Sequence, residues 1–225
     1  MNRTVKDYQE RREEILAVAQ ELFFSKGYED TSVQQIIDAV GIAKGTFYHY
    51  FDSKVDLLDA LVASMTRGQF QMAQTILQEP ELDAAQKLER LFLEIGGWKT
   101  DKRGFFLDIL PIWYSDENLI VRYKLTSLAK HTMQDVLARI IRQGLGEGIF
   151  STPYPEHTGD VVLGVIQNTS EEIALLLIDM HSKEDVIARL EGKLAVNQYA
   201  VNLLLGAQPG TVKIFDLDRI KLWFK

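Results

Sequence analysis

The sequence predicts an all-α protein with a small N-terminal unit of three helices joined to a larger antiparallel helical bundle. Long segments repeat apolar residues at three- and four-residue spacing, which is the period of an α-helix. The 15 glycines and 5 prolines of the 225 residues are few and fall mainly between these segments. We find neither a strand–helix alternation nor an internal repeat, so a parallel sheet and a solenoid are both disfavoured.

The first helix is predicted over residues 8–26 and ends at a glycine. Lys26 followed by Gly27 is the usual order of a cation and a glycine at a helix C-terminus. Its apolar residues recur at helical spacing and form one stripe: Ile15, Leu16, Ala19, Leu22 and Phe23.

Two short helices follow with a glycine between them. The second begins at Thr31 or Ser32, because a glutamine stands three residues after each and both arrangements fit a capping box. It ends at Gly41, and a third helix covers residues 43–50. A helix, a glycine turn and a second helix form the skeleton of a helix-turn-helix.

The remaining chain is predicted to be a series of longer helices. Ser53 and Asp56 cap a fourth helix that runs to Gln78, before Pro80. Further helices are predicted over residues 83–95, 103–113, 116–144, 155–180, 184–205 and 216–224. Residues 211–215 fit either an extended or a helical segment, and the sequence leaves that choice open.

The composition argues against several classes of protein. The chain has no cysteine, which excludes disulfides, thiol nucleophiles and thiolate-bound zinc. His131, His157 and His181 stand alone without a metal-binding spacing, and no nucleotide-binding or catalytic motif is found. We therefore expect no metal, no cofactor and no enzyme activity.

Nothing in the sequence indicates a membrane or secreted protein. The longest strictly apolar run is Ile173–Ile178, far below the roughly 18 residues of a spanning helix. The charged start lacks an apolar segment, so we expect no secretory signal, no membrane partner and a cytoplasmic location.

The third helix has the chemistry of a DNA-reading helix. It is small and polar at its start, and Gly45 in that first turn costs about 1 kcal/mol relative to alanine. A close approach of the backbone to DNA would justify that cost. Phe47 and Phe51 are expected in the core, since phenylalanine is a preferred buried residue.

From Ile15 to Leu58 the chain resembles the TetR/AcrR family of bacterial one-component repressors. The match includes Phe23 with Gly27-Tyr28, the block GIAKGTFYHYF from Gly41, and Ser53-Lys54. The resemblance implies a homeodomain-like DNA-binding domain over residues 1–52 and an effector-binding and dimerisation domain over residues 53–225. It also implies a ligand-released repressor that binds an inverted-repeat operator in double-stranded DNA as a homodimer.

The family pattern also assigns roles to individual residues. Ser32 and Gln34 would touch phosphate or a base edge, and Lys44, Gly45 and Thr46 would enter the major groove. Phosphate contacts would come from Tyr48, His49 and Lys54. A lysine can donate to guanine, and a threonine methyl can pack on thymine, so these residue types suit the roles.

The charge balance fits DNA binding less well. Residues 1–55 hold seven basic and nine acidic side chains, and the whole chain has a net charge of −7. A DNA-binding domain usually carries a basic face, so here a positive surface must come from how the basic side chains are arranged and not from their number. An all-α enzyme and a protein-binding adaptor with a remnant helix-turn-helix are therefore kept as alternatives.

Two surfaces of the larger domain are also predicted. A set rich in aromatic residues is expected either to pack in the core or to line the cavity of an unknown small-molecule effector: Phe70, Trp98, Phe105, Phe106, Asp108, Trp113 and Tyr123. Apolar residues of the last two long helices are expected to form a dimer interface or an intramolecular core: Ile173, Leu177, Leu190, Leu194 and Val201. The fourth helix would act as a lever between effector and DNA.

Overall fold

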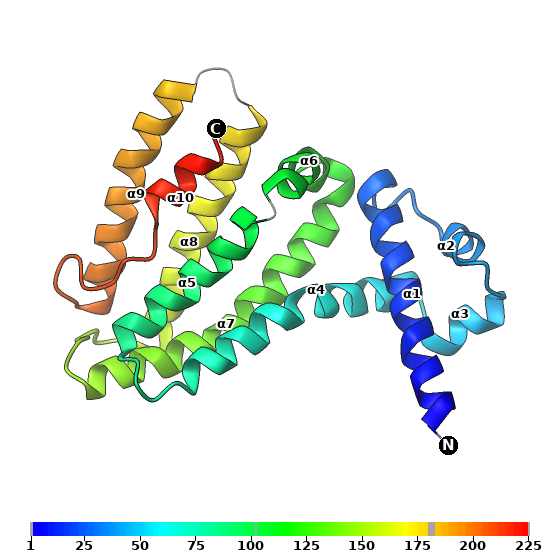
Figure 1. Cartoon of the computed structure of the whole chain (residues 1–225), viewed down its shortest axis with the longest axis horizontal. Helices are drawn as coiled ribbons and strands as arrows, with labels where there is room; N and C mark the ends of the chain where they lie inside the picture. The colour runs from blue at the N-terminus through cyan, green and yellow to red at the C-terminus, as the bar shows by residue number, and fades with distance from the viewer. Residues whose placement is uncertain (1, 102, 180–182, 225) are drawn as a thin grey trace. The chain divides into compact units, whose positions relative to one another are not determined.

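A computed structural model describes residues 2–101, 103–179 and 183–224, and every regular element within these ranges is helical (Figure 1). The side chains of residues 2–7, 97–101, 105, 109 and 183–185 lie outside the described part. The predicted all-α fold class is confirmed. The helices are α1 (Asn2–Lys26), α2 (Val33–Val40), α3 (Lys44–Tyr50), α4 (Lys54–Leu77), α5 (Ala84–Asp101), α6 (Arg103–Trp113), the short 3₁₀ helix η1 (Asp116–Asn118), α7 (Leu119–Gly146), α8 (Pro155–Ile178), α9 (Lys183–Leu205) and α10 (Leu217–Leu222).

The chain divides into two compact units that each contain non-contiguous segments. The first unit comprises Met1–Gly68 and Pro111–Ala129, and the second comprises Gln69–Leu110 and Lys130–Lys225. Helices α4, α6 and α7 therefore contribute residues to both units. The predicted division at residues 52 and 53 concerns function and stays a prediction.

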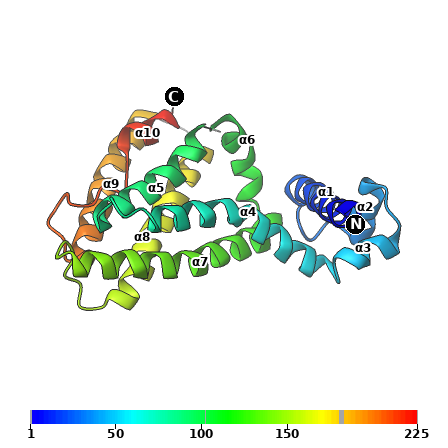
Figure 2. The same ribbon diagram turned by 60° about the horizontal axis from the view of Figure 1, so that its bottom comes forward.

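The first unit is a three-helix core in which α1 and α2 pack together (Figure 2). Ile15, Phe23, Ile36 and Phe47 are buried in it, as their spacing predicts. The turn after α1 is closed by Thr31, whose buried hydroxyl donates a hydrogen bond of 2.7 Å to the carbonyl of Gly27. This bond satisfies a carbonyl that the end of a helix leaves without a partner.

The segment from the end of α6 to the start of α7 is part of the same unit. The backbone N–H of Tyr28 donates to the carbonyl of Glu117 at 3.2 Å. The rings of Phe24 and Trp113 meet edge to face with centroids 5.7 Å apart. The single helix predicted over residues 116–144 is wrong at its start, because residues 116–118 form η1 before α7 begins.

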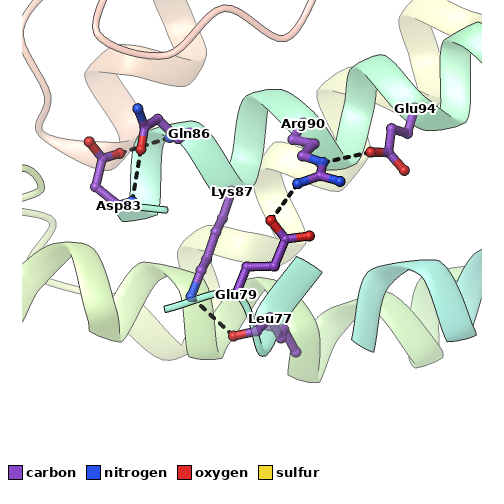
Figure 3. Close-up of polar contacts among 7 residues, drawn as sticks. All are labelled: Leu77, Glu79, Asp83, Gln86, Lys87, Arg90 and Glu94. Carbon is purple, nitrogen blue, oxygen red and sulfur yellow. Dashed lines mark hydrogen bonds and ion pairs between the residues drawn. The ribbon is translucent and has the colours of Figure 1, made fainter. Parts of the chain in front are cut away.

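A buried cation joins three helices in the second unit. Lys87 on α5 is only 5% exposed, and its ammonium donates to the carbonyl of Leu77 at 3.0 Å and to Oε1 of Gln143 at 2.9 Å (Figure 3 shows the contact with Leu77). Leu77 is the last residue of α4, so Lys87 satisfies a carbonyl at a helix C-terminus. Arg90, one turn further along α5, forms only exposed ion pairs with Glu79 and Glu94.

Residues 211–215 form no helix, which excludes the helical alternative that the sequence left open for them. The side chain of Asn202 accepts from the N–H of Val212 at 2.9 Å and donates to its carbonyl at 3.0 Å. Oε1 of Gln198 accepts from the N–H of Ile214 at 2.9 Å. Side-chain amides of α9 therefore form the hydrogen bonds to the backbone of this segment that a neighbouring strand would form in a sheet.

Helix α8 corrects the expectation that no segment is apolar enough to cross a membrane. By length and composition it qualifies, with a mean hydropathy of 1.5 over its most apolar 18 residues. Several of its side chains, including Val162, Leu163 and Leu177, are buried within the second unit. Core helices of bundles pass the same test, so this finding is weak support for a membrane segment.

Candidate nucleic-acid interface

Helix α2 begins at a cap that fixes the position of its first turn. The hydroxyl of Ser32 accepts from the N–H of Gln35 at 3.2 Å, and Oε1 of Gln35 accepts from the N–H of Ser32 at 2.7 Å. This resolves the ambiguity between Thr31 and Ser32 in favour of Ser32. Gln34 is exposed and donates to Asp38 at 2.8 Å.

Helix α3 has exposed polar residues on one side and buried aromatic residues on the other. Phe47 and Phe51 are almost fully buried, while Lys44 and Gly45 are exposed at the start of the helix. Gly41, with φ of 74°, adopts the left-handed conformation that the tight turn between α2 and α3 requires. The polar residues of α3 are thus held in place by the packing beneath them.

The remaining predicted contacts of α3 lie on or near the same exposed surface. Tyr48 is 46% exposed, His49 is exposed, and Thr46 is half-buried. Tyr8 of α1 packs on Tyr50 with centroids 4.6 Å apart and meets His49 edge to face at 5.7 Å. Residues 41–51 contain one lysine and no carboxylate. A phosphate group would therefore meet no negatively charged side chain in this segment.

Lys54 contacts the turn after α1, and sequence reasoning missed this contact. Its ammonium lies 4.2 Å from the ring centroid of Tyr28 and donates to the carbonyl of Glu29 at 3.2 Å. Burial, and then the charges of Glu29 and Asp59, raises the pKa of the Tyr28 hydroxyl. Lys54 therefore helps to hold the turn after α1, and its phosphate contact stays a prediction. The sequence separation of 25 residues left no local signal for this pair.

Sequence reasoning also missed Arg12, whose guanidinium carbon lies 5.2 Å from the ring centroid of Phe51. Arg12 belongs to α1 and Phe51 directly follows α3, so this cation–π contact ties the reading helix to the first helix. The helical stripe of α1 predicted a buried face, but it carried no signal for which aromatic ring the arginine would cover.

The predicted effector-pocket residues occupy several environments. Phe70, Asp108 and Tyr123 are exposed, and Tyr123 is 66% exposed on α7. Trp113 packs on Phe24 within the first unit. The side chains of Trp98 and Phe105 lie outside the described residues.

Phe106 of α6 meets Trp223, which directly follows α10, with ring centroids 6.2 Å apart. Both residues belong to the second unit. Among the predicted pocket residues, Phe106 is thus in contact with the C-terminal segment. The pocket itself stays a prediction.

The predicted dimer residues lie mainly inside the chain. Leu177, Leu190, Leu194 and Val201 are all less than 9% exposed, and Ile173 is half-buried. Helices α8 and α9 pack against each other, which accounts for this burial (Figure 1). The four buried side chains offer little surface to a second copy in this chain, and their place in a dimer interface stays a prediction.

Comparison with known proteins places the helix-turn-helix in a family. Residues 15–61 match the family described as bacterial regulatory proteins, tetR family. The transcriptional regulator TtgR of Pseudomonas putida is 27% identical over 95 residues, which cover 42% of this chain and 45% of that protein. The transcriptional repressor KstR2 of Rhodococcus jostii is 37% identical over 81 residues, covering 36% of this chain and 39% of that protein. The matched region thus spans less than half the length of these relatives.

The similarity of fold extends over most of the chain. The solved structure of FadR from Thermus thermophilus, a TetR-family transcriptional repressor in complex with lauroyl-CoA, has a TM-score of 0.52 and 18% identity. The similarity covers 84% of this chain and 93% of that chain. These relatives are named as regulators or repressors of transcription and not as enzymes. The helix-turn-helix segment of this chain thus belongs to the tetR family of bacterial regulatory proteins, and the chain as a whole has a fold similar to that of a solved member of that family.

Proposed function

We propose that this protein is a cytoplasmic, dimeric transcriptional repressor that binds an inverted-repeat operator and is released from it by a small-molecule effector. The observation that carries the proposal is the exposed, polar start of α3 on a buried aromatic base. Lys44 and Thr46 are suited to base edges in the major groove, while Ser32, Tyr48 and His49 are suited to the phosphate backbone. The family of the helix-turn-helix supports the same role.

Two copies of the chain would read two half-sites, and an apolar surface of α8 and α9 is available for dimerisation. Val196 and Leu203 are each 65% exposed, and both lie on α9. Leu175 of α8 and Tyr199 of α9 are also largely exposed. Exposed apolar residues grouped on neighbouring helices favour burial against a partner. We therefore infer a homodimer whose interface includes this exposed surface of α8 and α9.

The dimer is tested by introducing a charge into this surface. We expect Val196→Glu to give a monomer in sedimentation equilibrium at micromolar concentration, because the unpaired carboxylate would be buried in the interface. Thermal unfolding should show that the monomer is folded, since Val196 is exposed within the chain. Lys213→Glu, at an exposed site after α9, is the control and should remain a dimer. A dimeric Val196→Glu variant would contradict this interface.

DNA binding is tested with the ligand-free protein and the promoter region of its own neighbouring genes. Fluorescence anisotropy should show binding that is selective for sequence and weakens as salt is raised, because phosphate contacts release counterions. The adaptor alternative predicts no such binding. Under the adaptor alternative, Lys44→Ala and Tyr48→Ala, both at exposed positions, would weaken binding to a protein partner and would not change the anisotropy measured with promoter DNA.

The second unit is proposed to bind the effector. A structural neighbour of the same fold holds lauroyl-CoA, which supports a ligand-binding role for the second unit. In a repressor of this type, effector and operator oppose each other through a coupling free energy of about 1–3 kcal/mol, or 5–150-fold in affinity. The same factor must describe the effect of operator on effector binding.

A further inference from the structure

The C-terminal segment of the second unit is attached in two different ways. Residues 211–215 are held by the side-chain amides of Gln198 and of Asn202, which is itself buried. Val212 and Ile214 are buried in the main core of the unit. This stretch is therefore an integral part of the bundle.

Helix α10, by contrast, has polar attachments that lie at the surface. Lys221 pairs with Glu191 of α9 at 2.6 Å, and both side chains are more than one third exposed. Arg219 donates to the carbonyl of Leu93 at 3.2 Å, also at an exposed site. Exposed ion pairs contribute little stability. The apolar contacts around Phe224 are therefore the main opposition to local opening of α10, whereas residues 211–215 are held in addition by buried side-chain amides.

Phe224, just after α10, fills an apolar site that is separate from the main core. It is 3% exposed and clusters with Leu177 of α8 and Leu190 of α9. Leu107 and Leu110 of α6 pack against this cluster and are only partly buried. Figure 1 shows α10 beside α9 within the second unit. Phe224 thus occupies an apolar site bordered by α6, α8 and α9. We refer to the surroundings of Phe224 as the Phe224 site.

A buried guanidinium nitrogen lies on the same face of α6 as the Phe224 site. Arg103, Leu107 and Leu110 follow each other at four- and three-residue spacing, so they share one face of the helix. Nε of Arg103 is buried and has no hydrogen-bond partner among the described residues. An unsatisfied buried donor is costly, so such a group is expected to pair with a water or with a ligand. A carboxylate would satisfy it with a charge-assisted hydrogen bond.

We propose that the Phe224 site is the effector site, that α10 is a displaceable plug seated in it, and that the effector is a carboxylic acid with an apolar chain. The apolar chain replaces Phe224 among the leucines, and the carboxylate accepts from Arg103. Because the plug must open first, the apparent Kd of the effector equals its intrinsic Kd divided by the fraction of molecules in which the plug is open. This inference rests on the proposed repressor function, since it assigns the ligand that function requires.

The test locks the plug with a linker that a reductant can remove. The chain has no cysteine, so Glu191→Cys/Lys221→Cys introduces a single pair, at positions that face each other across α9 and α10. A thiol-cleavable bis-maleimide linker then holds α10 in place, and calorimetry measures the binding of decanoate. Arg142→Cys/Glu156→Cys is the matched control, because these residues also form an exposed pair between two helices of the same unit but lie outside the Phe224 cluster.

We expect the unlinked variant to bind decanoate, the linked variant to lose at least 90% of that binding, and cleavage of the linker to restore it. The linked control pair should bind as before. Arg103→Gln should weaken decanoate binding about tenfold or more and leave binding of the neutral 1-decanol unchanged, because only the carboxylate is paired with the arginine. Absence of decanoate binding by the unlinked protein, or binding that persists when the plug is linked, would overturn the inference.

The operator titration separates this inference from the proposed function. If the unlinked protein binds no operator, the repressor function fails whatever decanoate does. If the protein binds operator but decanoate binding does not depend on the linker, only the plug fails. The account predicts that decanoate releases the unlinked protein from operator and leaves the linked protein bound.

Discussion

Replacing Lys87 with methionine removes the buried cation that joins α4, α5 and α7. The substitution keeps most of the apolar length of the side chain and deletes its ammonium. The carbonyl of Leu77 then loses the donor that lies 3.0 Å away, and Gln143 loses the donor at 2.9 Å from its side-chain oxygen. The perturbation is therefore confined to two hydrogen bonds at the end of α4.

The expected loss of stability follows from these two bonds. A hydrogen bond to a charged group contributes about 1.5–3 kcal/mol, and a buried acceptor left without a donor costs about 1–3 kcal/mol. The methionine recovers part of this, because burying an ammonium is itself unfavourable. We expect the free energy of unfolding to fall by about 2–4 kcal/mol. For a protein of this size that corresponds to a decrease in Tm of roughly 4–16 °C.

Thermal unfolding followed by circular dichroism measures this change, and Arg90→Met is the matched control. Arg90 is on the same helix one turn away, but its ion pairs with Glu79 and Glu94 are exposed. Salt and water screen such pairs, so the control should change Tm little. Equal effects of the two substitutions would refute the argument, because the ammonium of Lys87 would then be solvated rather than bound at the end of α4.

Two further predictions concern a glycine and an ion pair. Gly27 has φ of 89°, and a Cβ added there would lie 2.5 Å from Cβ of Glu117. Gly27→Ala should therefore lower the free energy of unfolding of the first unit by about 1–3 kcal/mol, as measured by urea titration. Gly45→Ala is the control, because Gly45 lies at an open helical position, and it should be neutral or stabilising. The hydrogen bond from Arg142 holds the pKa of Glu156 below its ordinary value. The pair therefore stabilises the protein at neutral pH and loses that contribution as pH falls through the lowered pKa. The stability difference between wild type and Arg142→Gln, measured from pH 7 to pH 3, should shrink with decreasing pH, and a constant difference would contradict the assignment.

The helices were predictable because their ends carry local signals. Gly27 and Gly41 both adopt positive φ at helix ends, and Ser32 caps α2 through its own side chain. Such signals depend on residues within a few positions of each other. The reading surface of α3 was predictable for the same reason, since burial of Phe47 and Phe51 follows from a single short helix.

Contacts between distant segments were not predictable from one sequence. The stripe containing Leu190 and Leu194 indicated burial, but an apolar stripe does not say whether the same chain or a second copy covers it. Val196, on the same helix, is exposed and was not singled out. Likewise, side-chain amides of α9 satisfy backbone groups of the non-helical residues 211–215, and neither segment alone carries that information.

Selective binding of the ligand-free protein to its operator tests the central claim most directly. Anisotropy titrations should compare wild type with Lys44→Ala on the promoter DNA and on substituted half-sites. The account predicts a loss of about 1–3 kcal/mol for Lys44→Ala on the promoter DNA and relaxed preference at one base pair per half-site, as expected for a lysine that donates to guanine. A wild-type protein that binds operator and unrelated DNA equally, or an Lys44→Ala variant that binds as wild type does, would contradict it.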